Sequence, residues 1–336
     1  MARRLSGTVA AAFLAGLAGA AAADCPPPVH VVAPGETVFT IAESQYGALE
    51  AWEVIYTANL ERLPNPVEIL PGTELSLPCL EEVAEEPTPP GPEMRLLTAS
   101  NNAPFTDRDW PEQGMITELV RAALEETPAP VTFAIAWDDT LPGHLDALDA
   151  KDVDMGFPWA RPDCARLPDH ALCAAFHFSE PIVEVLSLLF VTESGGLSFD
   201  ENSDLHGRTL CRPAGAPTFD LDTAERQWLT RDLITLVTPP TPEACFALLA
   251  DGEVDAVAVN EFTGWTVLTD LGLRDTVAPL PTPLGVEGLH VIISKQHWRG
   301  TTHLYRINAG LAALKESARY DEIVARHLGT FWERVK

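Results

Sequence analysis

The sequence contains few positive charges. Of its 336 residues, 22 are lysine or arginine and 49 are aspartate or glutamate, which gives a net charge of −27. Nucleic acids and anionic membrane surfaces are themselves negative and repel a chain with this balance. The composition therefore argues against both partners and predicts an acidic, well-solvated surface.

Long apolar runs are scarce as well. One run, from Val9 to Ala22, follows a basic start at Arg3 and Arg4 and ends in an Ala-x-Ala motif. It is too short and too rich in alanine for a membrane span. It predicts a signal peptide at residues 1–23, cleaved after Ala23, and export to the periplasm. No later segment reaches 18 uninterrupted apolar residues, so we expect no transmembrane anchor.

Catalytic signatures are missing from the sequence. It has no G-x-S-x-G, no H-E-x-x-H and no phosphate-binding loop of the G-x-x-x-x-G-K type. Paired acids such as Asp138 and Asp139 are too common in so acidic a chain to indicate a glycosidase. We therefore expect a protein that is not an enzyme and needs no cofactor.

The six cysteines are an even number in a chain expected to be exported, which favours disulfides. Sequence order suggests local pairs, Cys164 with Cys173 and Cys211 with Cys245. The sequence has no C-x2-C pair, so a metal site is not the primary prediction. The alternative metal site would be formed by Cys164, Asp169, His170, Cys173 and His177.

Residues 29–78 carry the strongest pattern. They contain the turn Pro-Gly-Glu-Thr at 34–37, the helix positions Phe39, Ile41 and Ala42, Asn59, and Asn-Pro at 65–66 followed by Pro-Gly at 71–72. In this order and spacing the four parts resemble a LysM module, the small βααβ fold that binds N-acetylglucosamine chains. The resemblance implies a LysM domain at residues 24–80 and peptidoglycan as a partner.

The same resemblance implies where the glycan binds. Its groove would lie between the loops 35–39 and 66–72, with backbone amides holding the sugar N-acetyl groups. The implied contacts are Gly35, Glu36, Thr37, Phe39, Ile69 and Leu70. Because the first and last strands of that fold are neighbours, Cys25 and Cys79 are expected to join its ends.

Residues 81–93 are a spacer by composition. The segment holds five glutamates and four prolines and has almost no apolar residues, so it cannot bury a core. It separates the first module from a second unit at 94–336.

Strand and helix patterns alternate through this second unit. We predict strands near 95–99, 131–137, 153–157, 209–211, 234–237 and 254–259, and helices near 115–124, 141–148, 222–229, 242–249 and 302–328, the last split at 317–320. Such alternation is typical of an α/β fold with a mainly parallel sheet in each half.

Several motifs of the second unit occur in a recognisable order. They are NAPF at 102–105, LDALDAKDVDM at 145–155, FSEP at 178–181, LHGRT at 205–209, GEVDA at 252–256 and the ending ALKESARYDEIVARHL. Together they resemble a type 3 family extracellular solute-binding protein, the two-lobed receptor of amino-acid ABC importers. The overall expectation is thus an α/β chain, in which a βααβ module precedes a two-lobed type II periplasmic-binding-protein fold.

The resemblance implies a lobe of residues 94–184 and 286–336 and a second lobe of residues 185–285, with crossings near 181–188 and 281–288. It also implies a monomer that captures a small anionic or zwitterionic solute, with an ABC importer permease or a sensor as partner. The alternative is a non-transport, wall-associated structural or regulatory protein whose solute-binding fold docks a partner or a cell-wall fragment.

The implied ligand site lies in the cleft between the lobes. Arg166 follows Asp154 by twelve residues, the spacing of the family's carboxylate-binding arginine, and Arg161 is the rival anion ligand. A guanidinium can hold a carboxylate with two parallel hydrogen bonds. Asn260, with Glu261 beside it, stands where the family has the acid that binds the ligand's amino group. The other candidates are Trp159, which could stack on a ligand, and Asn102, Trp137, Asp138, Gly215 and Thr218.

Overall fold

The computed structural model describes residues 27–59, 62–63, 69–79, 93–128 and 130–336. The described residues up to 79 belong to one compact unit and those from 93 onward to another, and each is described by itself. The expected signal peptide, nearly all of the expected spacer and Cys25 lie outside the described residues. No described helix is long and apolar enough to span a membrane.

The first unit has the βααβ order predicted from the sequence. Its elements are β1 (Val29–Val31), α1 (Val38–Tyr46), the 3-10 turn η1 (Leu49–Ala51), α2 (Trp52–Ala58) and β2 (Glu74–Ser76). The two strands pair antiparallel, with His30 opposite Leu75. The helices cover one side of this small sheet, and their inward side chains, such as Ile41 and Ile55, are fully buried.

Asn59 explains one of the sequence signals of this unit. Its buried side-chain amide donates to the carbonyls of Ile55 (2.6 Å) and Ser76 (2.8 Å), and its side-chain oxygen accepts the Ser76 N–H (2.8 Å). One side chain thus ends α2 and ties it to β2, a role for which an amide with both donor and acceptor is needed.

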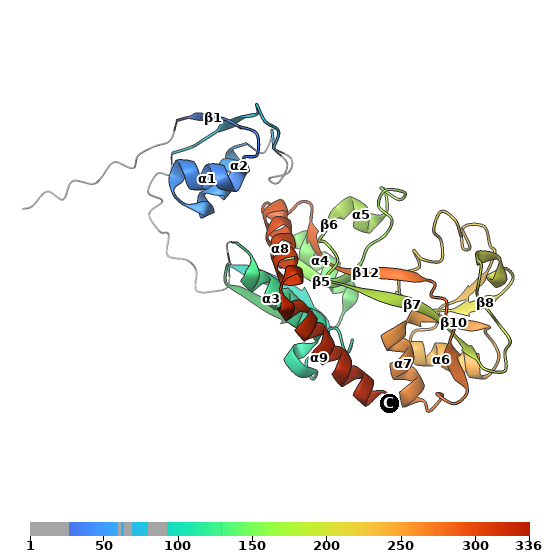
Figure 1. Cartoon of the computed structure of the whole chain (residues 1–336). Helices are drawn as coiled ribbons and strands as arrows, with labels where there is room; N and C mark the ends of the chain where they lie inside the picture. The colour runs from blue at the N-terminus through green and yellow to red at the C-terminus, as the bar shows by residue number, and fades with distance from the viewer. Residues whose placement is uncertain (1–26, 60–61, 64–68, 80–92, 129) are drawn as a thin grey trace, which may run out of the picture. The chain divides into compact units, whose positions relative to one another are not determined.

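The second unit is built on one ten-stranded sheet (Figure 1). Its strands are β3 (Met94–Thr98), β4 (Phe133–Trp137), β5 (Met155–Ala160), β6 (Phe176–Phe178), β7 (Val183–Thr192), β8 (Thr209–Cys211), β9 (Thr235–Val237), β10 (Ala256–Asn260), β11 (Val277–Pro279) and β12 (Gly285–Ser294). The order is β4-β3-β5-β12-β7-β10-β8-β9, with β11 beside β7 and β6 beside β12. β3 runs parallel to β4 and β5, and β8 runs parallel to β9 and β10, as the alternation predicted. The other pairs are antiparallel, which the prediction of a mainly parallel sheet did not include: β12 pairs with β5, β6 and β7, and β7 pairs with β10 and β11.

Helices cover this sheet on both faces. They are α3 (Met115–Glu126), α4 (Leu141–Ala150), α5 (Ala171–Ala175), α6 (Pro242–Ala250), α7 (Glu261–Asp270), α8 (Gly300–Glu316) and α9 (Ala318–Arg334), with 3-10 turns η2 (Pro111–Gln113) and η3 (Asn202–Leu205). On β10, Val257 and Val259 join one core, while Ala256 and Ala258 join the core on the opposite face. This two-residue period is the signature of a strand buried on both sides.

Two long strands connect the lobes. β7 and β12 run side by side and antiparallel through the centre of the second unit (Figure 1), and the crossings expected near 181–188 and 281–288 fall within or beside them. Ser187 pairs with Gly285, and Val183 pairs with Leu289. A second contact joins α7 to the end of α9, where the Phe262 ring lies edge-on to Phe331 with centroids 5.0 Å apart.

The helix predicted at 222–229 is absent, which corrects the prediction from the sequence. Residues 213–234 form successive turns instead. The Asp222 carboxylate accepts hydrogen bonds from the Leu229 N–H (3.1 Å) and from the Thr230 N–H (3.1 Å) and hydroxyl. Such local bonds compete with the helical ladder, and Gln227 has a positive φ of 47°.

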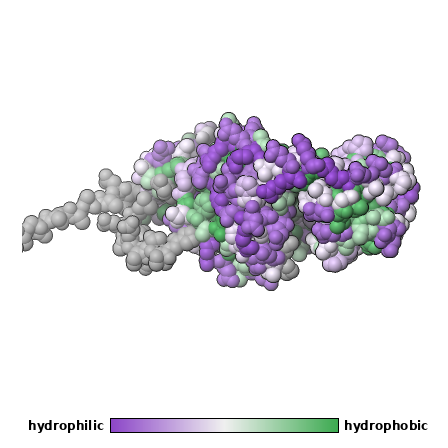
Figure 2. Space-filling view, turned by 90° about the horizontal axis from the view of Figure 1, so that it is seen from below, coloured by the Kyte–Doolittle hydropathy of each residue, from purple (hydrophilic) through white to green (hydrophobic). Residues whose placement is uncertain are grey.

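Two disulfides predicted from sequence order are confirmed. Cys164 is bonded to Cys173, and Cys211 is bonded to Cys245. The first bond removes both thiolates from the alternative metal site. The bond expected between Cys25 and Cys79 involves a residue outside the described ranges. Hydrophilic residues cover most of the face shown in Figure 2, in keeping with the net charge of −27.

Candidate functional site

The larger of two described pockets lies where the crossing strand β12 meets both lobes. Its volume is about 470 Å³. The first lobe supplies Arg161–Asp163, which follow β5 directly, and the second lobe supplies residues 219–226 from the turns after β8. Ligands of α/β sheets bind outside the carboxyl ends of the strands, and Arg161 stands at such an end. The lining residues are Arg161, Pro162, Asp163, Asn202, Phe219, Asp220, Thr223, Glu225, Arg226, Leu284, Gly285, Val286, Glu287 and Gly288.

The two arginines of this pocket differ in how they are bonded. Arg226 donates from all three of its guanidinium nitrogens, to the Asn202 side chain (3.0 Å) and to the carbonyls of Asp220 (2.7 Å) and Leu284 (2.6 Å). Arg161 is exposed, and among the described residues it has neither a hydrogen-bond nor an ion-pair partner; its guanidinium lies 5.8 Å from the Phe178 ring. Arg226 therefore supports the wall, whereas Arg161 is available to an anion.

A buried ion pair lies between this pocket and a smaller one of about 120 Å³. Arg212 is 5% exposed and binds the Asp220 carboxylate through two hydrogen bonds, of 2.5 and 2.8 Å. Its Nε donates to the Ala258 carbonyl (3.0 Å), and the Ser187 hydroxyl also donates to Asp220 (3.0 Å). Asp220 lines the large pocket and Arg212 lines the small one. The buried guanidinium is therefore already bound by a carboxylate of the same chain.

Glu287 lines both pockets from β12. Its carboxylate has no hydrogen-bond or ion-pair partner within the described part of the chain. Burial, together with the negative charge of Asp220, raises the pKa of Glu287 to about 7 despite the opposing charge of Arg212. Burial would also raise the pKa of Asp220, but its hydrogen bonds with Arg212 and the positive charge of that residue outweigh burial and hold the pKa below its usual value.

Arg166 lies outside both pockets. Its guanidinium donates to the Asp222 carbonyl in the second lobe, and its Nε lies 3.8 Å from the Asp163 carboxylate. From the same disulfide-closed loop, the His170 ring lies edge-on to Phe219 with centroids 5.3 Å apart. This loop therefore bridges the two lobes beside the large pocket.

Three other candidates of the first lobe serve local structure. Trp159, on β5, is partly buried against the core beneath α4, with its ring 6.3 Å from that of His144. Trp137 ends β4, and the Arg108 guanidinium lies 5.2 Å from its ring. The Asp138 carboxylate accepts the Thr140 N–H (2.9 Å) and hydroxyl (2.5 Å) just before α4, and these bonds lower its pKa.

Asn102 is exposed in the loop after β3, where its backbone pairs with that of Thr106. Neither Gly215 nor Thr218 lines a described pocket, although Pro213, Ala216 and Pro217 line the small one.

Asn260 and Glu261 begin α7. The Asn260 side chain lines the small pocket and caps the helix, since its oxygen accepts the Thr263 N–H (2.9 Å) and its amide donates to the Thr263 hydroxyl (2.9 Å). Burial raises the pKa of Glu261, against the opposing effect of a hydrogen bond from the Leu186 backbone. The cap uses the Asn260 groups that a ligand would otherwise engage.

Sequence reasoning missed Arg212, Asp220, Arg226 and Glu287 as site residues. The one available signal was Glu287, an acid inside the apolar strand pattern at 284–294. Asp220 and Arg226 lie in irregular turns, and Arg212 directly follows the short strand β8, so no periodicity marks these three charges.

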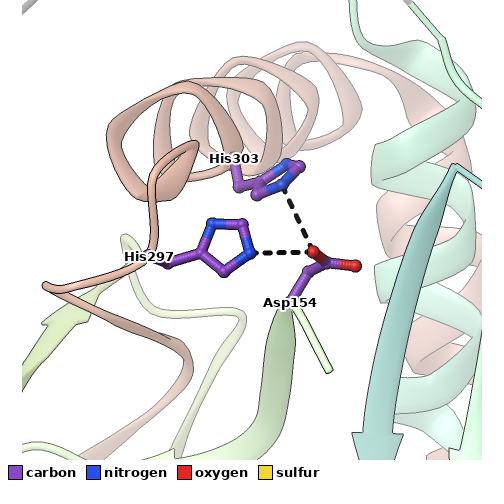
Figure 3. Close-up of side chains that lie close together, drawn as sticks. All are labelled: Asp154, His297 and His303. Atoms are coloured by element: carbon purple, nitrogen blue, oxygen red, sulfur yellow. Dashed lines mark ion pairs between the residues drawn. The ribbon is translucent and has the colours of Figure 1, made fainter. Parts of the chain in front are cut away.

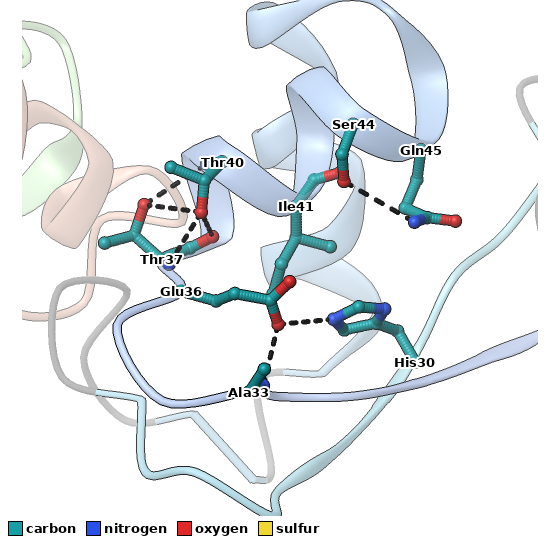
Figure 4. Close-up of polar contacts among 8 residues, drawn as sticks. All are labelled: His30, Ala33, Glu36, Thr37, Thr40, Ile41, Ser44 and Gln45. Carbon is teal, nitrogen blue, oxygen red and sulfur yellow. Dashed lines mark hydrogen bonds and ion pairs between the residues drawn. The ribbon is translucent and has the colours of Figure 1, made fainter.

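In the first unit, three of the predicted glycan residues, Gly35, Glu36 and Thr37, lie in the turn before α1 (Figure 4). The Glu36 carboxylate accepts the Ala33 N–H (2.7 Å) and lies 2.7 Å from the His30 ring nitrogen. Both contacts, the Ala33 bond first, lower the pKa of Glu36. Thr37 caps α1 through reciprocal hydrogen bonds with Thr40.

The remaining glycan candidates differ in exposure. Gly35 has a φ of +87°, which favours glycine in this turn. Phe39 packs on Trp52, with ring centroids 4.9 Å apart, and Ile69 is partly buried. Leu70 is 75% exposed, an apolar side chain on the loop where the groove is expected.

Known proteins resemble this chain in structure rather than in sequence. Neither the protein-family models nor the curated protein sequences contain a match. The GluR0 ligand-binding core from Nostoc punctiforme in complex with (L)-glutamate matches 69% of this chain and 98% of its own, with 19% identity and a TM-score of 0.51. The second unit has the fold of a periplasmic solute-binding protein.

Two further structures agree. A substrate binding protein of an amino acid ABC transporter matches 69% of this chain and 97% of its own, with 19% identity and a TM-score of 0.50. A histidine kinase sensor domain with similarity to periplasmic binding proteins matches 70% of this chain and 96% of its own, with 22% identity and a TM-score of 0.52. At these identities the likeness concerns the fold alone.

Proposed function

We propose that residues 94–336 capture a small zwitterionic or anionic solute, such as an amino acid, in the 470 Å³ pocket between the lobes. The observation that carries this proposal is the pair of opposite charges, Arg161 and Glu287, that line this pocket without partners in the described residues. Arg161 receives the carboxylate of the solute, and ionised Glu287 receives its amine. A solute that contacts both lobes shifts the open–closed equilibrium by its differential affinity for the two states.

The structural neighbours support this class of ligand. One was solved with L-glutamate and another serves an amino acid ABC transporter, while a third is the sensor domain of a histidine kinase. We propose accordingly that an importer permease or a sensor reads the closed form.

The test is a thermal-shift screen of amino acids, dicarboxylates and muropeptides, followed by calorimetry on any hit. Arg161→Ala should weaken binding by roughly 1.5–3 kcal/mol, the contribution of a hydrogen bond to a charged group, because Arg161 is exposed in the unliganded structure. Arg231→Ala, an exposed arginine of the second lobe outside the pocket, is the matched control and should bind normally. Unchanged affinity in Arg161→Ala would remove this residue from the site.

The charge of Glu287 gives an independent check. Because its pKa is raised to about 7, the carboxyl loses its proton as the pH rises through 7. Affinity for an amine-bearing solute should therefore increase between pH 6 and pH 8, and Glu287→Gln should abolish this increase. An equal pH dependence in both proteins would exclude Glu287 as the amine ligand.

A second candidate function follows from the buried ion pair. The Asp220 carboxylate already accepts two hydrogen bonds from the Arg212 guanidinium, as the carboxylate of a ligand would. This favours a wall-associated regulatory protein whose fold docks a partner in place of a solute. A blank across the whole ligand panel would support this candidate.

We further propose that residues 24–80 bind peptidoglycan as a LysM module. The βααβ order, the Gly35 turn and the exposed Leu70 support this proposal. The intact protein should co-sediment with purified peptidoglycan, and residues 94–336 alone should not. Leu70→Asp should reduce the bound fraction, whereas Val31→Asp, at a 56% exposed position on β1, should not. Equal binding by both variants would place the groove elsewhere.

A further inference from the structure

Asp154 meets two histidines from much later in the sequence, His297 and His303, at one end of the first lobe (Figure 3). Asp154 directly precedes β5, His297 lies in the turn after β12, and His303 lies in the first turns of α8. The Asp154 Oδ1 is 3.0 Å from His297 Nε2 and 3.7 Å from His303 Nε2. Each residue offers one ligand atom, and these atoms all lie within 4.8 Å of one another.

His303 has an unusual environment for a buried polar group. It is 2% exposed, and neither of its ring nitrogens has a hydrogen-bond partner in the described part of the chain. Burial, opposed by the negative charge of Asp154 and aided by the positive charges of Arg306 and Arg299, lowers the pKa of His303 to about 3. Its Nε2 faces the Asp154 carboxylate at 3.7 Å. Buried polar groups without a partner are rare and call for an explanation.

The second lobe contains a counterpart that shows what such an aspartate does without histidines. Asp255, like Asp154, opens a strand and accepts a backbone N–H from the start of the neighbouring strand, here Thr209 (2.7 Å). The other oxygen of Asp255 pairs with Arg208 (3.3 Å). In the first lobe the equivalent oxygen of Asp154 faces two imidazoles instead of an arginine.

We propose that Asp154, His297 and His303 form a binding site for a divalent transition-metal ion, with zinc as the best-fitting common ion. Two imidazole nitrogens and one carboxylate oxygen are a donor set that zinc accepts, with a water as fourth ligand. Bonds of about 2.0–2.2 Å in a tetrahedron put neighbouring donor atoms roughly 3.3 Å apart, close to the 3.0 and 3.7 Å separations here. The Asp154 side chain is 19% exposed and leaves an approach for the ion and the water.

Binding would rearrange one hydrogen bond. His297 Nδ1 now accepts the Arg299 N–H at 3.1 Å, which assigns the ring proton to Nε2, facing Asp154. When Nε2 ligates the ion, that proton moves to Nδ1, and the bond from Arg299 is exchanged for the bond to the metal. Binding of the ion would therefore give His303 a partner and would remove the hydrogen bond from the Arg299 N–H to His297.

The position of the site indicates a structural role. Asp154 lies at the amino end of β5, seven residues before Arg161, or about 23 Å along an extended strand. An ion here would tie β5 to the β12–α8 turn and to α8 itself, far from the proposed solute pocket. Its effect should appear in the stability of the first lobe rather than in solute affinity.

The test uses the purified protein, stripped with EDTA and dialysed. Zinc should bind at one equivalent by calorimetry and elemental analysis, and it should raise the Tm. His303→Gln and His297→Gln should lose the bound zinc, while His206→Gln, at an exposed position of the second lobe, should keep it. Should the histidine variants fail to fold, Asp154→Asn should lose the zinc instead. Cobalt(II) added to the unmodified protein should give the absorption of a coordinated ion.

Two outcomes would overturn the site. Failure of the unmodified protein to retain zinc after dialysis, with a Tm unchanged by zinc or EDTA, would reduce the cluster to a set of packed side chains. Equal zinc retention in His303→Gln and His206→Gln would show that the ion binds elsewhere.

Discussion

Glu287→Gln should change how the stability of the protein depends on pH. Glu287 lies on the crossing strand β12, and burial and the Asp220 charge raise its pKa to about 7 from the usual 4.5. A raised carboxyl pKa means that the folded state binds the proton more tightly than the unfolded state. The contribution to stability is therefore full below pH 4.5 and is lost as the pH rises through 7.

The size of the effect follows from the two pKa values. Each unit of pKa difference corresponds to about 1.4 kcal/mol, so full ionisation costs the folded state about 3 kcal/mol. Between pH 5.5 and pH 8 the loss is about 2 kcal/mol. For a unit of this size that loss corresponds to a Tm decrease of about 4–8 °C. Glutamine has a similar shape and no charge, so the variant should lack this component and be more stable than the native protein at pH 8.

The assay is calorimetric or fluorescence-detected melting of both proteins at half-unit steps from pH 5 to pH 8.5. Because all other titrating groups are common to both, the difference between the two curves isolates Glu287. Glu184→Gln, an exposed acid on the neighbouring crossing strand, is the matched control and should follow the native curve. Parallel curves for Glu287→Gln and the native protein would refute the burial argument.

Two further predictions concern packing and cross-links. Gly310→Ala should destabilise the first lobe by about 1–3 kcal/mol in denaturant unfolding, because a Cβ there would lie 1.8 Å from the Ala123 carbonyl oxygen. Gly329→Ala, with open space around it on α9, should instead stabilise the protein by up to about 1 kcal/mol. Replacing Cys211 and Cys245 by serine should cost roughly 2–4 kcal/mol for a loop of 34 residues, and an unchanged denaturation midpoint would contradict this.

The helices and strands of the second unit were predictable because their apolar side chains recur at a regular spacing. The strand predicted at 254–259 is β10 (Ala256–Asn260), and the helix predicted at 242–249 is α6 (Pro242–Ala250). The break predicted within 302–328 falls at Ser317, between α8 and α9. In each case burial on a fixed face imposes a period that the sequence displays.

The turns at 213–234 were not predictable in the same way. Asp222 to Leu229 shows helical spacing, yet the Asp222 carboxylate bonds the backbone seven and eight residues ahead. A helix cannot form where a side chain takes its amides in this geometry. That irregular segment contains Asp220 and Arg226. The second-lobe wall of the pocket is therefore formed by a segment without regular periodicity, which the sequence does not predict.

The same limit explains why the anion ligand moved from Arg166 to Arg161 in our proposal. Motif spacing identifies a position but not its partners. Arg166 sits in a loop closed by the bond between Cys164 and Cys173, and the guanidinium reaches across to the Asp222 carbonyl. One guanidinium nitrogen of Arg166 is thus committed to the contact between the lobes, whereas Arg161 would exchange only water for a ligand.

The buried pair of Arg212 and Asp220 sets the chemistry that a solute must match. Because Asp220 holds Arg212 with two charge-assisted hydrogen bonds, a solute carboxylate could reach this arginine only by displacing a carboxylate already in place. Displacement would leave Asp220 buried beside Glu287, two like charges without compensation. The solute therefore meets a pocket whose available cation is Arg161 at one wall and whose acid is Glu287 at the crossing strand. This separation of charge favours a zwitterion over a simple dianion, because a second carboxylate would face Glu287 and Asp220 rather than a cation.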